Sequence, residues 1–167
     1  EGAGDMYARA FSRETEALAT NLSFDVSDDS LSVSARFLTE NREASIELLR
    51  AALLEPRFDE DAVERVRGQV ISNIQSNQKD PNDIARQTFD KIAFGDHPYG
   101  SSLNGTLETV AGLTRDDLIE AHSAVLARDR IYVGAVGDIT PEELGELLDT
   151  LLGDLPAEGA PMPRDRR

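Results

Sequence analysis

A chain of 167 residues is long enough for one domain with a hydrophobic core and short for two. Its net charge of −15 argues against nucleic acid and anionic membrane surfaces as partners, because both are bound mainly through Lys and Arg. There is no cysteine, which excludes thiolate metal sites, and no apolar run approaches the roughly 20 residues of a membrane span.

Two segments near the start alternate apolar and polar residues. Leu22–Val26 and Leu31–Leu38 place apolar side chains at every second position, which is typical of strands with one buried face. The intervening Ser27–Ser30 contains only Ser and Asp and predicts a turn, so the two segments should form an antiparallel hairpin. A helix is predicted before them, over residues 4–19.

The middle and the end of the chain have the periodicity of amphipathic helices. Apolar residues recur every three or four positions, and capping residues and prolines divide the pattern into separate helices. Gly68 lies inside one of them, at a cost of roughly 1 kcal/mol relative to alanine, which suggests that another element packs closely there. The helices are expected over Asn41–Leu54, Asp59–Lys79, Pro81–Phe94, Thr106–Ala111, Thr114–Leu126 and Thr140–Leu152, with Asn41, Thr114 (paired with Asp117) and Thr140 as caps.

A third strand is predicted at Arg130–Val136, where Ile131, Val133 and Ala135 share one face. The order of helix, hairpin, helices, strand and helix indicates an α+β fold, a mainly antiparallel sheet with helices packed on one face. Residues 157–167 are rich in Pro, Gly and charge and read as a linker. The folded domain is therefore expected to cover residues 1–156.

The two histidines do not form a recognisable metal site. His97 lies in the turn-rich loop Gly95–Gly100 and His122 in an amphipathic helix 25 residues later. A pair of imidazoles that converges on one ion from one helix face is separated by three or four residues. We expect His97 to order its loop and His122 to lie at the surface or edge of its helix.

Three acidic pairs fit structural roles better than catalytic ones. Asp28–Asp29 lies in a turn, whereas Asp116–Asp117 and Glu142–Glu143 lie in first turns of helices, where the helix dipole favours carboxylates. Serines are plentiful, but no G-x-S-x-G motif accompanies them. Nucleophilic catalysis therefore has no support in the sequence.

Several short motifs follow one another in a set order along residues 1–156. Two are the more specific, the loop His97-Pro98-Tyr99-Gly100 and the strand end Val136-Gly137-Asp138-Ile139. The others are Glu1-Gly2-Ala3-Gly4, Leu38-Thr39-Glu40-Asn41, Pro56-Arg57-Phe58-Asp59 with Glu64-Arg65, Asp80-Pro81, Phe94-Gly95-Asp96, Gly105-Thr106 and Leu113-Thr114-Arg115-Asp116-Asp117-Leu118. In this order and spacing the set resembles the M16 metallopeptidase family, which includes pitrilysin, insulin-degrading enzyme and mitochondrial processing peptidase.

The resemblance implies an α+β half of such a peptidase, in which catalytic halves carry H-x-x-E-H on a helix upstream of where this chain begins. It also implies that the helix Asp59–Lys79 matches the one that supplies a glutamate as the third zinc ligand. Asn73 falls at that position, and Val66, seven residues earlier, falls where a second glutamate usually lies. Zinc favours thiolate, imidazole and carboxylate ligands over an amide, so we expect no metal and no catalytic residue in this chain.

Family members without the zinc site serve as non-catalytic subunits or halves. They face an active subunit or half, which carries H-x-x-E-H and the zinc, across an enclosed chamber and help to hold the peptide substrate. The resemblance therefore implies two partners, that catalytic half and a peptide. The pattern is most similar to bacterial proteins of two-subunit type, and the compartment, periplasmic or cytoplasmic, stays open.

Two alternatives stay open at this stage. One is an active zinc metalloendopeptidase whose ligands lie upstream and include a glutamate of this helix, although Glu60 and Glu64 precede position 73 by thirteen and nine residues. The other is a structural module similar to the core proteins of respiratory complexes. The zinc content of the full-length protein separates the active peptidase from the other two hypotheses. Co-purification with a subunit that carries H-x-x-E-H separates the non-catalytic subunit from the structural module.

Overall fold

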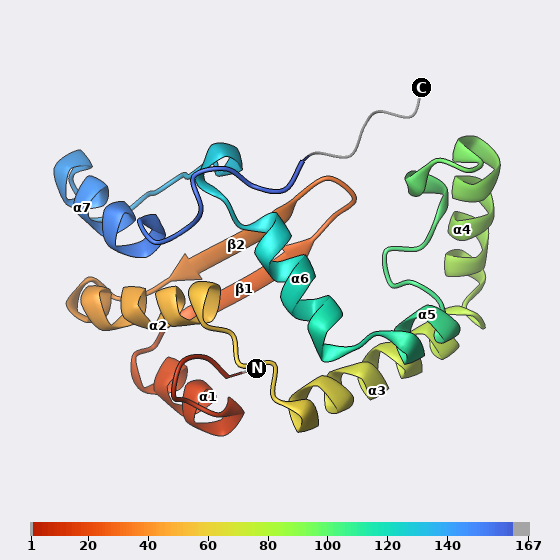
Figure 1. Cartoon of the computed structure of the whole chain (residues 1–167), viewed down its shortest axis with the longest axis horizontal. Helices are drawn as coiled ribbons and strands as arrows, with labels where there is room; N and C mark the ends of the chain where they lie inside the picture. The colour runs from red at the N-terminus through yellow and green to blue at the C-terminus, as the bar shows by residue number, and fades with distance from the viewer. Residues whose placement is uncertain (1, 162–167) are drawn as a thin grey trace.

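The computed structural model describes residues 2–161 as a mostly helical chain with one small hairpin (Figure 1). Single turns of 3-10 helix lie at Thr39–Asn41, Pro98–Gly100 and Arg128–Arg130. The strands are β1 (Asn21–Val26) and β2 (Leu31–Arg36), and the helices are α1 (Ala8–Ala17), α2 (Arg42–Leu54), α3 (Glu60–Asn77), α4 (Pro81–Phe94), α5 (Leu107–Gly112), α6 (Arg115–Val125) and α7 (Pro141–Leu152).

The predicted hairpin is confirmed. β1 and β2 pair antiparallel, and the apolar residues of the two strands oppose one another in the register Leu22↔Ala35, Phe24↔Val33 and Val26↔Leu31. The turn closes through the Ser27 N–H, which donates to the Ser30 carbonyl at 2.8 Å. Period-two patterning therefore set both the pairing and the face on which these side chains lie.

The prediction of a third strand at Arg130–Val136 is wrong for the described residues, 2–161. Arg128–Arg130 forms a 3-10 turn, and residues 131–136 adopt no regular secondary structure and pair with no strand of the described chain. The fold is α+β as predicted, but the sheet of two strands is a minor part of it rather than a main layer. Alternation fixes an extended conformation, whereas a strand also needs a neighbour for its backbone N–H and C=O groups.

The core lies where α2 and α7 meet the hairpin, a region that we call the base. Ile46, Leu49 and Leu53 of α2 are buried, as the sequence predicted, and contact Leu151 of α7. Half-buried side chains of both strands pack against this cluster, among them Leu22 and Val33. A buried hydrogen bond of 2.6 Å between the Thr20 and Ser45 hydroxyls joins the start of β1 to α2.

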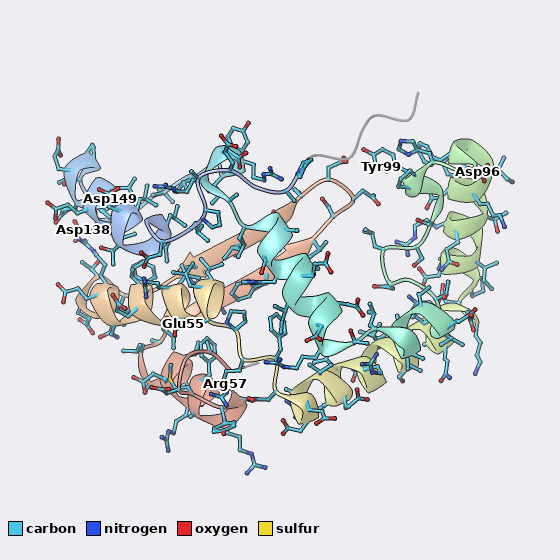
Figure 2. The ribbon with its side chains drawn as sticks, in the orientation of Figure 1. Glu55, Arg57, Asp96, Tyr99, Asp138 and Asp149 are labelled. Carbon is cyan, nitrogen blue, oxygen red and sulfur yellow. The ribbon has the colours of Figure 1, made fainter. Side chains whose placement is uncertain are left out.

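The N-terminal residues are tied to the link between α2 and α3. The Arg57 guanidinium donates to the Gly4 carbonyl at 2.9 Å, to the Asp59 carboxylate at 2.8 Å, and lies over the Tyr7 ring at 4.0 Å (Figure 2). Gly4 has a φ of 53°, which is outside the helical range. The helix predicted from residue 4 therefore begins only at Ala8.

Two of the three predicted helix caps are confirmed. The Thr114 and Thr140 hydroxyls each accept a hydrogen bond from the backbone three residues later, and Asp117 and Glu143 complete both capping boxes. Asn41 lies at the N-cap position of α2, as predicted, but makes no capping bond. Its side chain caps no helix because the Nδ2 donates to the Leu18 carbonyl at 2.8 Å, and a 3-10 turn precedes α2 instead.

Helix α4 and the loop that follows it, residues 81–104, extend away from the base, and we call them the arm (Figure 1). No residue of α4 is buried. The arm meets the hairpin turn through the Tyr99 hydroxyl, which donates to the Asp29 carboxylate at 2.7 and 2.8 Å. No helix within residues 2–161 is long and apolar enough to cross a membrane.

Gly68 does not mark a close approach, contrary to the prediction. A Cβ built at this position would meet no atom within 4 Å, because this side of α3 faces solvent. Packing therefore gives no reason for a glycine in the middle of the helix.

Candidate functional site

The candidate site lies on one face of α3. Val66 and Asn73 are seven residues apart, about two helical turns, so both side chains lie on the same face of the helix. Asn73 is exposed, and its Oδ1 accepts a hydrogen bond of 2.9 Å from the Gln69 Nε2. Val66 is 44% exposed. The face presents one aliphatic group and two neutral amides.

Gln69 belongs to this site, although the sequence analysis did not identify it. The signal was present, because Gln69 and Asn73 have the i, i+4 spacing at which side chains meet on a helix. Their hydrogen bond uses the oxygen that would approach a metal if Asn73 were a ligand.

The two glutamates of α3 do not share this face. At about 100° per residue, Glu64 lies about 180° and Glu60 about 140° around the helix from Asn73. The Glu64 carboxylate is 3.0 Å from the Arg67 Nε, and Arg67 also donates to the backbone carbonyls of Val110 and Leu113. Arg67 thereby links α3 to the α5 region, and neither glutamate lies on the face that carries Asn73.

The histidines are not brought together with the α3 face. The His97 Nδ1 accepts the Tyr99 N–H at 3.2 Å, so His97 orders its own loop, as the sequence suggested. His122 is half-buried at the edge of its helix, where its Nε2 lies 2.8 Å from the Leu53 carbonyl and its ring packs edge-on against Phe58. Across residues 2–161, no three His, Asp or Glu side chains are grouped as a metal site would require.

The acidic pairs have structural partners. Asp29 accepts the Tyr99 hydroxyl, and Asp117 and Glu143 form capping boxes. Bonds from the Thr114 hydroxyl and N–H lower the pKa of Asp117, and the Thr140 N–H lowers the pKa of Glu143. Groups stabilised as carboxylates at helix starts are poor candidates for general acids.

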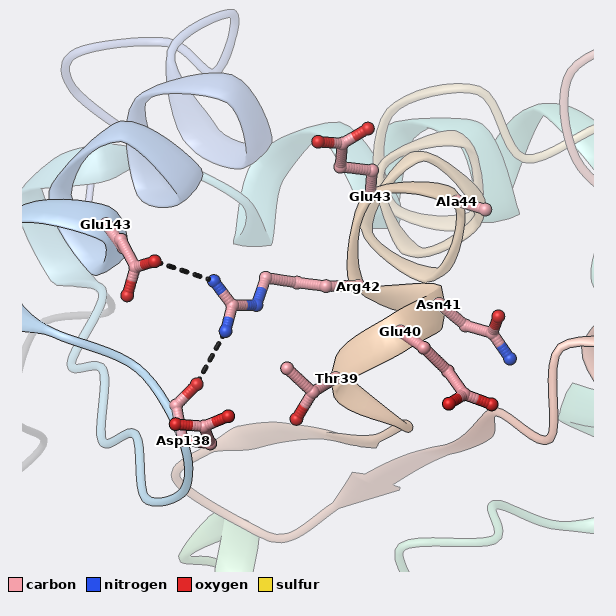
Figure 3. A pocket seen from close by; sticks show the side chains of 8 residues that line it. All are labelled: Thr39, Glu40, Asn41, Arg42, Glu43, Ala44, Asp138 and Glu143. Atoms are coloured by element: carbon pink, nitrogen blue, oxygen red, sulfur yellow. Dashed lines mark hydrogen bonds and ion pairs between the residues drawn. The ribbon is translucent and has the colours of Figure 1, made fainter.

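A shallow polar pocket of about 640 Å³ lies between the start of α2 and the start of α7 (Figure 3). Arg42 crosses it, pairing with the Glu143 carboxylate at 3.4 Å and donating to the Asp138 carbonyl. No nucleophile and base lie together in it, and its ion pair joins α2 to α7. The residues that line it are Thr39, Glu40, Asn41, Arg42, Glu43, Ala44, Asp138 and Glu143.

Comparison with known families covers nearly the whole chain. Residues 2–107 match the family described as Insulinase (Peptidase family M16), and residues 112–167 match the one described as Peptidase M16 inactive domain. A non-peptidase homolog, YmxG of Helicobacter pylori, is 26% identical over 93% of this chain and 36% of its own length. An uncharacterised zinc protease of Mycobacterium leprae is 31% identical over 68% of this chain and 26% of its own length.

Solved structures agree on the fold. The crystal structure of a peptidase M16 inactive domain from Pseudomonas fluorescens superposes with a TM-score of 0.92 at 21% identity, over 98% of this chain and 40% of that one. At this identity the likeness shows the fold alone. The chain spans between about a quarter and two-fifths of the length of these relatives.

Proposed function

The chain belongs to the insulinase family of peptidases, M16, and we propose that it is part of a subunit or half that does not itself cut substrate. The observation that carries this proposal is the α3 face, where the resemblance places Val66 and Asn73 at two positions that glutamates occupy in the family. The match of residues 112–167 to an inactive domain and the similarity to a non-peptidase homolog support it.

The chemistry of this face supports a non-catalytic role. A zinc peptidase needs three protein ligands and a bound water whose pKa the metal lowers. Asn73 offers a neutral amide that is already bonded to Gln69, and Val66 offers no donor atom. We infer that zinc and the H-x-x-E-H motif belong to a catalytic partner subunit or half, and that no cofactor is bound by this chain.

We further propose that this half helps to hold an extended peptide for the partner. A peptide adds to a free strand edge through backbone hydrogen bonds, and side-chain contacts then select its sequence. Within residues 2–161, β1 and β2 each pair on one side only, and residues 131–136 pair on neither. These three segments are the candidate edges.

Zinc analysis of this chain, prepared without a catalytic partner subunit or half, tests the absence of a metal site. After dialysis against a mild chelator we expect far less than one zinc per chain. About one retained zinc per chain would overturn the proposal and favour the alternative of an active peptidase.

The single substitution Asn73→Glu tests how the α3 face is assigned. It restores one carboxylate, which cannot form a site that needs two imidazoles and a base, so no peptidase activity should appear. Asn73→Gln, which keeps an amide, is the matched control. Chelator-sensitive cleavage of an unstructured peptide by Asn73→Glu alone would contradict the assignment.

Hydrogen exchange on the full-length protein, with and without an uncleaved peptide, tests the binding role. Binding should slow exchange in at least one of the three candidate segments. A peptide that binds while none of them gains protection would show that this half holds substrate in another way, or not at all.

A further inference from the structure

One exposed face of α3 carries no charge. No Lys, Arg, His, Asp or Glu lies between Arg67 and Lys79, although 29% of the chain is charged. Four uncharged polar side chains of this stretch lie within about 100° of one another around the helix and are all exposed, namely Gln69, Ser72, Asn73 and Ser76. We call these four residues the amide face.

The absence of charge on the amide face is typical of a contact surface. An exposed helix face usually carries charged side chains that pair at i, i+4. Surfaces that bind another molecule are depleted of charged residues where they are covered, because a charge costs more to desolvate than an amide or a hydroxyl. The amide face therefore suits an uncharged polar group better than an anion or a cation.

Gln69 and Asn73 leave one donor and one acceptor next to each other on this face. A side-chain amide has one acceptor oxygen and an NH2 group that donates. The Gln69 Nε2 donates to the Asn73 Oδ1 at 2.9 Å, which fixes the orientation of the Asn73 amide. Within residues 2–161, the Asn73 Nδ2 and the Gln69 Oε1 make no hydrogen bond.

An extended peptide offers the groups that match this donor and acceptor. Each of its residues points one N–H and one C=O towards the same edge, whatever its side chain is. The Asn73 Nδ2 can donate to the C=O, and the Gln69 Oε1 can accept the N–H. A helix of a partner protein is disfavoured as the ligand, because its N–H and C=O groups are already bonded to one another.

We propose that the amide face holds the backbone of an extended peptide, with Asn73 donating to a peptide carbonyl and Gln69 accepting the N–H of the same peptide residue. This inference rests on the proposed function, because it names the part of the peptide that this half contacts and the two residues that position it. It adds a contact on α3 to the candidate strand edges. Because both bonds are made to the backbone, this contact does not select the peptide sequence.

Binding of a fluorescein-labelled, unstructured peptide to the full-length protein, prepared without a catalytic partner, tests the inference. Asn73→Asp keeps the size of the side chain and an oxygen for Gln69 but replaces the donor with a carboxylate, so the Kd should rise about 10-fold. Gln69→Ala removes the acceptor and should raise the Kd roughly 3- to 10-fold. Gln75→Ala is the control and should leave the Kd unchanged, because Gln75 is exposed on the other side of α3.

Peptide esters test whether the backbone is the group that is held. An ester in place of one peptide bond removes a single N–H and keeps every side chain, and the ester is moved along the peptide one position at a time. At one position it should weaken binding to the wild-type protein roughly 3- to 10-fold and have no effect on binding to Gln69→Ala, because both changes remove the same hydrogen bond. A purely structural role of Gln69 would not produce this coupling.

The remaining outcomes contradict the inference. If the wild-type protein binds the peptide and both Asn73→Asp and Gln69→Ala bind it equally well, the amide face does not hold the peptide, whereas the proposed function stands. If the variants bind less tightly but the ester and Gln69→Ala weaken binding additively at every position, the contact is not with a backbone N–H. If the wild-type protein does not bind the peptide, this inference and the proposed role in holding substrate both fail.

Discussion

The base and the arm are built from the same kind of amphipathic helix, yet only the base buries its apolar face. In α2 the residues Ile46, Leu49 and Leu53 lie in the core with α7 and the hairpin. In α4 the corresponding apolar residues Ile84, Phe89 and Ile92 are exposed. An apolar stripe predicts that a helix packs against something, but the element that it meets comes from the rest of the fold.

The arm is held mainly by polar and aromatic contacts at its ends. The Asp80 carboxylate caps α4 by accepting the Asn82 N–H at 2.8 Å. At the other end, Tyr99 bonds to Asp29 and packs edge-on against Phe94 and His97 (Figure 2). Each exposed contact of this kind contributes little to stability. We therefore expect the free energy of local opening to be lower for the arm than for the base.

The largest expected difference between the two regions comes from side-chain truncation. Leu49→Ala in the base removes a side chain that is 5% exposed and should lower the free energy of unfolding by about 2–5 kcal/mol. Ile92→Ala in the arm removes one that is 80% exposed and should change it by less than about 0.5 kcal/mol. Urea denaturation of both variants measures this, and similar losses would show that the arm is covered in solution.

A smaller loss is expected from the buried hydroxyl pair of the base. Ser45→Ala removes the partner of the Thr20 hydroxyl and leaves that buried group unsatisfied, at a cost of about 1–3 kcal/mol. In the arm, Ser101→Ala removes only an exposed bond to the Pro98 carbonyl. It should be nearly neutral in the same denaturation experiment. A neutral Ser45→Ala would mean that water replaces the lost partner.

Gly68→Ala, on the solvent side of α3, should raise the free energy of unfolding by about 1 kcal/mol. Alanine is the better helix former, and no atom lies within 4 Å of its Cβ. The control is Gly100→Ala in the arm. A Cβ there would lie 2.6 Å from the Gly95 carbonyl oxygen, so this variant should be destabilised. Thermal unfolding separates the two, and a loss for Gly68→Ala would indicate that a partner packs against this face.

Acidification should weaken the starts of α6 and α7 by the smallest amount. The pKa values of Asp117 and Glu143 are lowered in the folded chain, below their ordinary 3.8 and 4.5, by bonds from Thr114 and Thr140. The unfolded chain then binds more protons than the folded chain. The stabilisation is therefore complete above the ordinary pKa values and is lost as the pH falls through the lowered pKa values of the folded chain. Unfolding followed between pH 6 and pH 3 should show a shallower pH dependence for Asp117→Asn than for Asp116→Asn, which leaves the cap intact. Equal slopes would contradict this assignment.

The sequence by itself determined the local features of this protein. Alternation in Leu22–Val26 and Leu31–Leu38 predicted the hairpin, and the threonine caps predicted where α6 and α7 begin. The helix positions of Val66 and Asn73 follow from seven-residue spacing alone. Each of these depends on residues within a few positions of one another, so the chain carries the information without its tertiary context.

Only the tertiary structure decided what each apolar face meets. Arg130–Val136 has the pattern of a strand, but pairing depends on a neighbour that its own sequence does not supply. The amphipathic pattern did not reveal that α4 stays open, that Gly68 faces solvent or that Asn41 binds the Leu18 carbonyl. Burial and long-range hydrogen bonds arise between segments far apart in the chain, so periodicity predicts a face and the fold determines its partner.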